Sequence, residues 1–175
     1  MWKKSRNVII TYTPIQDKTK TQGGVHLNDE VSYQALDKSK AKISTVKGVD
    51  KPFSTSPQAG AGLGGGADGL GEGEGEERAS LGYNWRGKGW LMIASSKWEI
   101  LGYGDEQGTG NSWVVTYFAK TLFTPAGVDV YSRKGQLRPE TLDGVKAALK
   151  GLGGDVAKLA GEVFEVAYDG ERESA

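Results

Sequence analysis

The sequence predicts a mainly β protein, an antiparallel β-barrel or curved half-barrel with one C-terminal helix packed on it. Segments rich in β-branched and aromatic residues recur between residues 8 and 133, and such segments favour strands. Gly, Pro and Asn residues separate them as turns require. A helical repeat appears only after these segments. Strands and helices therefore do not alternate as they do in a parallel α/β sheet.

The N-terminal part contains three predicted strands. Val8–Ile15 is rich in β-branched and aromatic residues and ends near Pro14, a residue that sheets tolerate mainly at edges and strand ends. Val31–Leu36 and Lys42–Val49 both alternate in the manner of half-buried strands, with a polar DKSK turn between them. Residues 29–50 are therefore expected to form a hairpin.

Four more strands are expected in the C-terminal half, near residues 89–95, 97–103, 112–123 and 127–133. Alternation along 112–123 places Trp113, Val115 and Tyr117 on one face and Phe118 and Lys120 on the other. Both faces are largely apolar, which is typical of a strand covered on both sides. The C-terminal helix is expected to cover one face, and the barrel interior lies on the other.

The predicted helix spans residues 139–152. It starts with Pro139 and Glu140, which suit the first turn of a helix. Apolar residues then recur at helical spacing until glycines end the repeat; they are Leu142, Val145, Ala148, Leu149 and Leu152. Beyond the glycines, we expect a short helical turn followed by a last strand over Val163–Tyr168; one longer helix is the alternative.

The 175 residues are expected to form one domain, 1–175, in which 54–80 is a Gly-rich flexible surface loop. The loop contains two G-x-G-x-x-G matches, but no helix signal follows them and several Glu residues do, so a nucleotide site is not expected. The stretch GYNWRGKG at 82–89 resembles a P-loop, but it lacks the final Ser or Thr and a following helix. It is interpreted as the entry to a strand.

The amino-acid composition argues against several classes of function. Because 22 Lys and Arg balance 22 Asp and Glu, no nucleic-acid partner is expected. The chain has no Cys and a single His, His26, so we expect neither a metal site nor a cofactor. No apolar run approaches the roughly 20 residues of a membrane span, and the N-terminal run is too short for a signal peptide. A soluble cytoplasmic protein is expected.

Aromatic residues concentrated between residues 83 and 132 predict a cavity that holds a small hydrophobic or aromatic molecule, because Trp and Tyr combine apolar area with a polar group. A filled barrel is the structural alternative, and a cofactor-independent isomerase, cyclase or decarboxylase is the enzymatic one. The candidate general acids or bases are His26, Glu99, Tyr117 and Lys120. No catalytic residue is assigned. Candidate ligand-binding residues are Tyr33, Trp98, Glu99, Trp113, Tyr117, Lys120 and Arg133.

Two resemblances agree with this interpretation. The segments KGWLMIASSKWEILGYG, WVVTYFAKTLFTPAGVDVYSRK and FEVAYD resemble uncharacterised fungal lipocalin-like proteins of calycin type, although the G-x-W signature of kernel lipocalins is absent. ITYTPIQ, KGVDKPF and the stretch 113–137 are similar in order and spacing to a violacein-pathway enzyme family that folds as a curved half-barrel. That resemblance implies chemistry on a small aromatic intermediate without metal or cofactor. No functional residue of either family is assigned to a position in this sequence.

Overall fold

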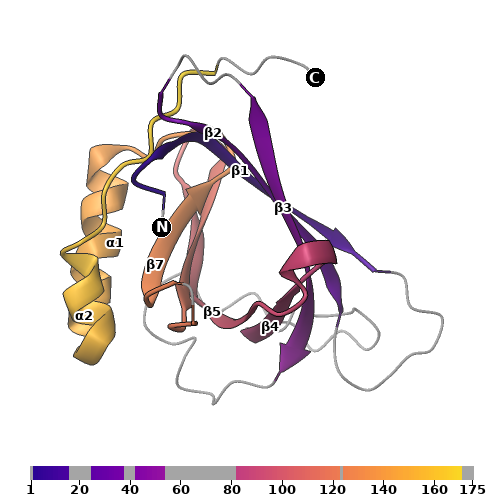
Figure 1. Ribbon diagram of the computed structural model, residues 1–175. Helices are drawn as coiled ribbons and strands as arrows, with labels where there is room; N and C mark the ends of the chain where they lie inside the picture. The colour runs from indigo at the N-terminus through magenta and orange to yellow at the C-terminus, as the bar shows by residue number, and fades with distance from the viewer. Residues whose placement is uncertain (1, 16–24, 38–41, 54–81, 123, 171–175) are drawn as a thin grey trace, which may run out of the picture.

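The computed structural model describes residues 2–15, 25–37, 42–53, 82–122 and 124–170. Seven strands form one antiparallel sheet in which every strand pairs with its neighbours in sequence (Figure 1). They are β1 (Ser5–Pro14), β2 (Leu27–Ala35), β3 (Ile43–Phe53), β4 (Gly82–Gly87), β5 (Ser95–Glu106), β6 (Asn111–Phe118) and β7 (Gly127–Ser132). The predicted hairpin over 29–50 is confirmed as β2 and β3.

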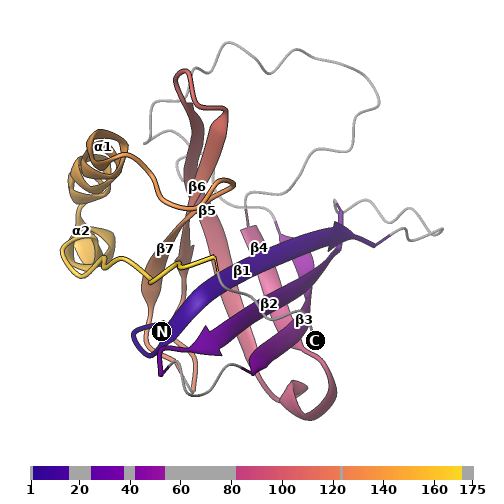
Figure 2. The same ribbon diagram turned by 90° about the horizontal axis from the view of Figure 1, so that it is seen from above.

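The sheet curls into a half-barrel, as Figure 2 shows from above. Strands β1 and β7 are its two edges and do not pair with each other. Two short helices, α1 (Pro139–Gly151) and α2 (Gly154–Ala160), lie against the side of β7. The mainly β half-barrel is confirmed, with two C-terminal helices where one was expected. The Gly-rich loop expected over 54–80 lies outside the described residues.

The apolar core lies between the helices and the outer face of β5, β6 and β7. Val115 on β6 and Leu149 on α1 are completely buried, and full burial of a Leu or Val side chain contributes about 1.5–3 kcal/mol. Around the buried residues pack half-buried side chains of the sheet and helices, namely Trp113, Tyr117, Val128, Val130, Ala148 and Val156. The prediction that one face of 112–118 is covered by the helix at 139–152 is therefore correct.

The strand predicted over 89–95 is wrong. The sequence before it, Gly82–Gly87, forms β4, and Gly89–Leu91 forms a 3₁₀ turn, η2. Gly89 has a φ of 62°, a left-handed conformation that interrupts a strand. Trp90 and Ile93 are 87% and 82% exposed, so their apolar character does not reflect burial in the sheet. The P-loop-like stretch is thus a strand and not a phosphate loop.

Two other boundaries differ from the predictions. Strand β6 ends at Phe118 and not at residue 123, because Thr121 and Thr124 form a turn through hydrogen bonds between their hydroxyls and backbones. The last strand expected over Val163–Tyr168 does not form. After α2 the chain makes only an isolated parallel bridge between Ala167 and Arg6, at a bulge that interrupts the register of β1.

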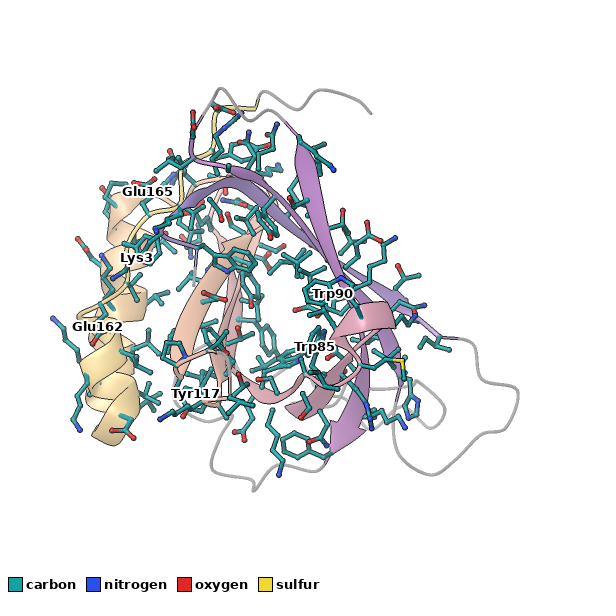
Figure 3. All side chains as sticks on the ribbon, viewed as in Figure 1. Lys3, Trp85, Trp90, Tyr117, Glu162 and Glu165 are labelled. Atoms are coloured by element: carbon teal, nitrogen blue, oxygen red, sulfur yellow. The ribbon has the colours of Figure 1, made fainter. Side chains whose placement is uncertain are left out.

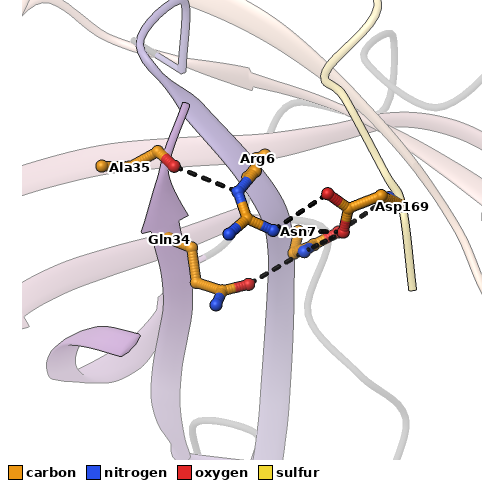
Figure 4. A network of polar contacts seen from close by, with 5 residues as sticks. All are labelled: Arg6, Asn7, Gln34, Ala35 and Asp169. Carbon is orange, nitrogen blue, oxygen red and sulfur yellow. Dashed lines mark hydrogen bonds and ion pairs between the residues drawn. The ribbon is translucent and has the colours of Figure 1, made fainter. Parts of the chain in front are cut away.

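A buried polar network holds the C-terminal segment at that bulge (Figure 4). The Arg6 guanidinium, 4% exposed, donates to both carboxylate oxygens of Asp169 at 2.9 and 3.2 Å and to the carbonyl of Ala35. The completely buried Asn7 donates to Asp169 at 2.6 Å and to Gln34 at 2.8 Å. Asn7 has a φ of 51°, which Asn tolerates better than most residues. Charge pairing and hydrogen bonds thus compensate the burial of these polar groups.

Candidate functional site

Alternation along the paired strands brings a row of aromatic rings onto the concave face of the half-barrel. Tyr83 lies opposite Trp98 in the register of β4 and β5. The two rings are stacked with centroids 4.7 Å apart, and Tyr12 of β1 stacks on Trp98 at 5.7 Å. Rings from three strands therefore meet inside the curl. We call Tyr12, Trp98 and Tyr83 the aromatic stack.

Three carboxyl groups on the same face each accept a hydrogen bond from an indole. The Trp98 Nε1–H donates to Asp50 Oδ1 at 2.8 Å. Trp85 donates to Asp29, and Trp2 donates to Asp129. Figure 3 shows Trp85 inside the curl of the sheet. We call these the indole–carboxyl pairs, Asp50–Trp98, Asp29–Trp85 and Asp129–Trp2.

Gly48 makes room for the Trp85 indole. Asp29 lies directly opposite Gly48 in the register of β2 and β3, and a Cβ on Gly48 would lie 2.0 Å from Trp85 Nε1 and 2.9 Å from the Arg86 carbonyl oxygen. Real Cβ atoms do not approach other atoms so closely, so a side chain at this position displaces the ring. The absence of a side chain at position 48 is what lets the indole N–H meet the carboxyl of Asp29.

Asp29 and Asp50 are diagonal neighbours on adjacent strands, which places such residues roughly 7–8 Å apart. Their residues are 9% and 0% exposed. Burial, together with the nearby Asp50 carboxyl, raises the pKa of Asp29 from 3.8 to about 7, against the lowering effect of the Trp85 bond. Burial also raises the pKa of Asp50 to about 6.

These raised pKa values fix the sign of the pH effect on stability. Well below pH 3.8 both carboxyls are protonated whether the chain is folded or unfolded. Between there and about pH 7 the unfolded chain loses its protons first, so the stability falls as pH rises and then levels off. The ionised pair is therefore a destabilising feature of the fold at neutral pH. Such features are concentrated at functional sites.

The β7 side of the concave face is also polar at its centre. Burial raises the pKa of Asp129, and the Trp2 bond opposes this rise. The Tyr131 hydroxyl shares a 2.9 Å hydrogen bond with Thr116 and a further one with Tyr12. Burial, followed by the negative charge of Asp129, raises the pKa of Tyr131. The Tyr12–Tyr131 bond links the two edge strands of the sheet.

A cleft of about 1030 Å³ opens between the edges of β1 and β7 and continues under the C-terminal segment 162–168. We call it the seam cleft. Its concave wall includes Tyr12, Val114, Phe118, Asp129 and Tyr131. Tyr12 is 37% exposed, so the aromatic stack is accessible from the cleft.

The residues predicted to bind a ligand lie in different parts of the fold. Trp98 belongs to the aromatic stack, and Tyr33 is on the concave face, 5.4 Å from the Trp2 ring. Trp113 and Tyr117 pack on the helices, and Glu99 pairs with Tyr117 on that outer face. Lys120 is exposed beyond the end of β6. Arg133 is exposed after β7 and, like Trp113, borders the seam cleft.

The structure thus brings Tyr33 and Trp98 to one face and separates the other five candidates from them. The acid–base nominee His26 lies just before β2. Sequence reasoning missed Tyr12 and the carboxyls of Asp29, Asp50 and Asp129. A signal was present for one of them, because Asp29 shares the alternating face of Val31 and Tyr33. An acid on an apolar face is unusual unless it has a partner or a function.

Comparison with known protein families, curated proteins and solved structures found no match. Among the helices described by the structure, none is long and apolar enough to cross a membrane. Within the same part of the chain, no group of three or more His, Asp or Glu side chains gathers in a way that could hold a metal ion. The geometry of the concave face is therefore the basis on which a function is proposed below.

Proposed function

We propose that this protein binds a small hydrophobic or aromatic molecule in the seam cleft, against the aromatic stack. Ligand sites typically have volumes of roughly 300–1,000 Å³, with apolar walls and a few polar groups that orient the ligand. The seam cleft has about this volume.

One observation carries the proposal. Tyr12 forms part of a three-ring stack and lines the cleft, and yet the residue is 37% exposed. A Tyr that served only the core would bury its ring, since aromatic side chains gain most of their free energy from area removed from water. A partly exposed Tyr at the end of an aromatic stack offers apolar surface to a ligand.

Replacement of Tyr12 by Ala tests this proposal. We expect the wild-type protein to bind N-phenyl-1-naphthylamine, measured by the rise in probe fluorescence. We expect Tyr12→Ala to weaken binding about tenfold or more, because the ligand loses a stacking surface. Thr13→Ala is the matched control, since Thr13 is exposed on the other face of the same strand. Absence of binding to the wild type, or equal affinity in both variants, would contradict the proposal.

A second candidate function is cofactor-independent catalysis by proton transfer. The observation in its favour is the pKa of about 7 at Asp29, near the value at which a carboxylate works best as a general base at neutral pH. The test substrate is 5-nitrobenzisoxazole, whose ring opens when a base removes its C3 proton and the N–O bond breaks. Acceleration that rises through about pH 7 and disappears in Asp29→Asn supports catalysis. A rate equal to that in buffer excludes it for this substrate.

A further inference from the structure

We propose that the molecule bound at the seam cleft is an arylalkylamine in its protonated form, whose ammonium group is held by the carboxylates of Asp29 and Asp50. This inference rests on the proposed function and narrows it from apolar ligands in general to organic cations with an aromatic body.

The hydrogen bonding of the two carboxyls is incomplete in a specific way. Each uses one oxygen to accept an indole N–H, from Trp85 and Trp98 respectively. The other oxygens, Oδ1 of Asp29 and Oδ2 of Asp50, are buried without a hydrogen-bond partner in the described part of the chain. Buried acceptors without a donor are rare in folded proteins. A primary ammonium group brings three N–H donors, enough to bond both oxygens.

The charge balance points to a cation. Among the residues that the structure describes, no Lys, Arg or His forms an ion pair with either carboxyl. Two ionised acids on neighbouring strands repel each other, as the effect of Asp50 on the pKa of Asp29 indicates. Burial of a charge without a partner is unfavourable. A ligand with one positive charge removes part of that penalty, whereas an anion would increase it.

The surrounding rings favour an organic cation. An ammonium group within about 6 Å of a Trp or Tyr ring face gains a cation–π attraction. The indoles of Trp85 and Trp98 already touch the two carboxyls, and Tyr12 stacks on Trp98. A metal ion fits less well, since three or more acidic or His ligands do not gather in the described residues.

Tyr12 connects the cleft to the carboxyls. It lies opposite Asp29 in the register of β1 and β2, on the same face, and directly opposed residues have Cβ atoms about 4.5–5.5 Å apart. It also lines the seam cleft. Neither carboxyl lines the cleft itself, so in this proposal the ammonium group passes the Tyr12 ring to reach Asp29, while the aromatic body stays against that ring in the cleft.

Three probes of similar size test the inference on the full-length protein. They are phenethylamine, a cation, 2-phenylethanol, which is neutral, and 3-phenylpropanoate, an anion. Binding is measured by isothermal titration and by the change in tryptophan fluorescence, at about pH 8. We expect phenethylamine to bind about tenfold or more tightly than 2-phenylethanol, and 3-phenylpropanoate to bind weakest.

Acid conditions provide a test that needs no variant. Protonation removes the charges that hold the ammonium, so we expect phenethylamine affinity to fall about tenfold or more between about pH 8 and about pH 5. The affinity for 2-phenylethanol should change little. Other titratable groups on the same concave face are Tyr12 on β1, Tyr33 on β2, Tyr83 on β4 and Asp129 and Tyr131 on β7.

Two substitutions localise the effect. Asp29→Asn and Asp50→Asn keep an oxygen that can accept the indole N–H and remove the charge. We expect each to lower phenethylamine affinity toward that of 2-phenylethanol and to leave 2-phenylethanol affinity unchanged. Glu30→Gln is the matched control, because Glu30 follows Asp29 on β2, points to the opposite face and pairs with Lys47 at 2.8 Å.

The outcomes separate this inference from the proposed function. The inference is overturned if phenethylamine and 2-phenylethanol bind with equal affinity. It is also overturned if the phenethylamine affinity changes neither with pH nor in the two Asn variants. Either result leaves a site for apolar ligands. Binding of N-phenyl-1-naphthylamine without binding of phenethylamine does the same. Failure of every probe overturns both.

Discussion

Replacement of Asp169 by Ala is expected to lower the free energy of unfolding by about 3–5 kcal/mol, because it leaves the buried guanidinium of Arg6 without its counter-charge. Arg6 is 4% exposed, and the carboxylate also accepts from Asn7 at 2.6 Å. Asp169 also joins the C-terminal segment to β1, so its replacement releases the chain beyond α2 as well.

The matched control is Asp155→Ala. Asp155 forms an ion pair with Lys158 at 3.1 Å, close to the 2.9 Å of the Arg6–Asp169 pair, but both side chains of the control pair are more than three-quarters exposed. Exposed pairs contribute about 0–1 kcal/mol. Urea unfolding of both variants measures the difference. Equal, small losses in the two variants would show that the buried network does not anchor the C-terminal segment.

Replacement of Gly48 by Ala is expected to lower the free energy of unfolding by about 2–6 kcal/mol. The new Cβ overlaps the Trp85 indole and approaches a backbone oxygen, and overpacking of this kind costs about 1–3 kcal/mol. The displaced indole no longer donates to Asp29, and a buried acceptor that loses its donor costs about 1–3 kcal/mol more. Thermal unfolding and the NMR signal of the Trp85 indole N–H report the two effects separately.

Gly144→Ala is the control for Gly48→Ala. Gly144 lies in α1, and apart from its chain neighbours and the backbone of its own helix no described atom lies within 4 Å of the position that its Cβ would take. The same substitution should therefore stabilise the helix by about 0.5–1 kcal/mol. Opposite signs for the two Gly→Ala variants are the expected result. If Gly48→Ala unfolds like the wild type and the indole signal stays in place, the close packing of Trp85 over β3 is wrong.

Local patterns were sufficient to predict most strands. Alternation identified the hairpin of β2 and β3 and the two covered faces of β6, because side chains of a strand point alternately to its two sides. Alternation also separated Tyr117 from Lys120. It could not tell which face of β6 was concave, since both are apolar; that choice depends on the helices, which pack against Trp113, Val115 and Tyr117.

The candidate site was harder to predict because it is assembled from distant strands. The Trp98–Asp50 bond joins residues 48 positions apart, and its existence depends on the registers of β3, β4 and β5 together. For the C-terminal segment, the sequence predicted a strand that does not form. Val163–Tyr168 has the composition of a strand, yet it pairs with β1 only at Arg6, because pairing depends on the geometry of the partner edge and not on composition alone.

The ionisation of Asp29 offers the most direct test of the central claim that its carboxylate receives a bound ammonium group. Carbon-13 NMR can follow the Asp29 carboxyl through a pH titration, first in the free protein and then with saturating phenethylamine. We expect the pKa of Asp29 to be about 7 in the free protein and to fall by about one pH unit or more with the amine, since a nearby positive charge favours the ionised form. A midpoint near 3.8 in the free protein, or a midpoint that the amine does not move, would contradict the account.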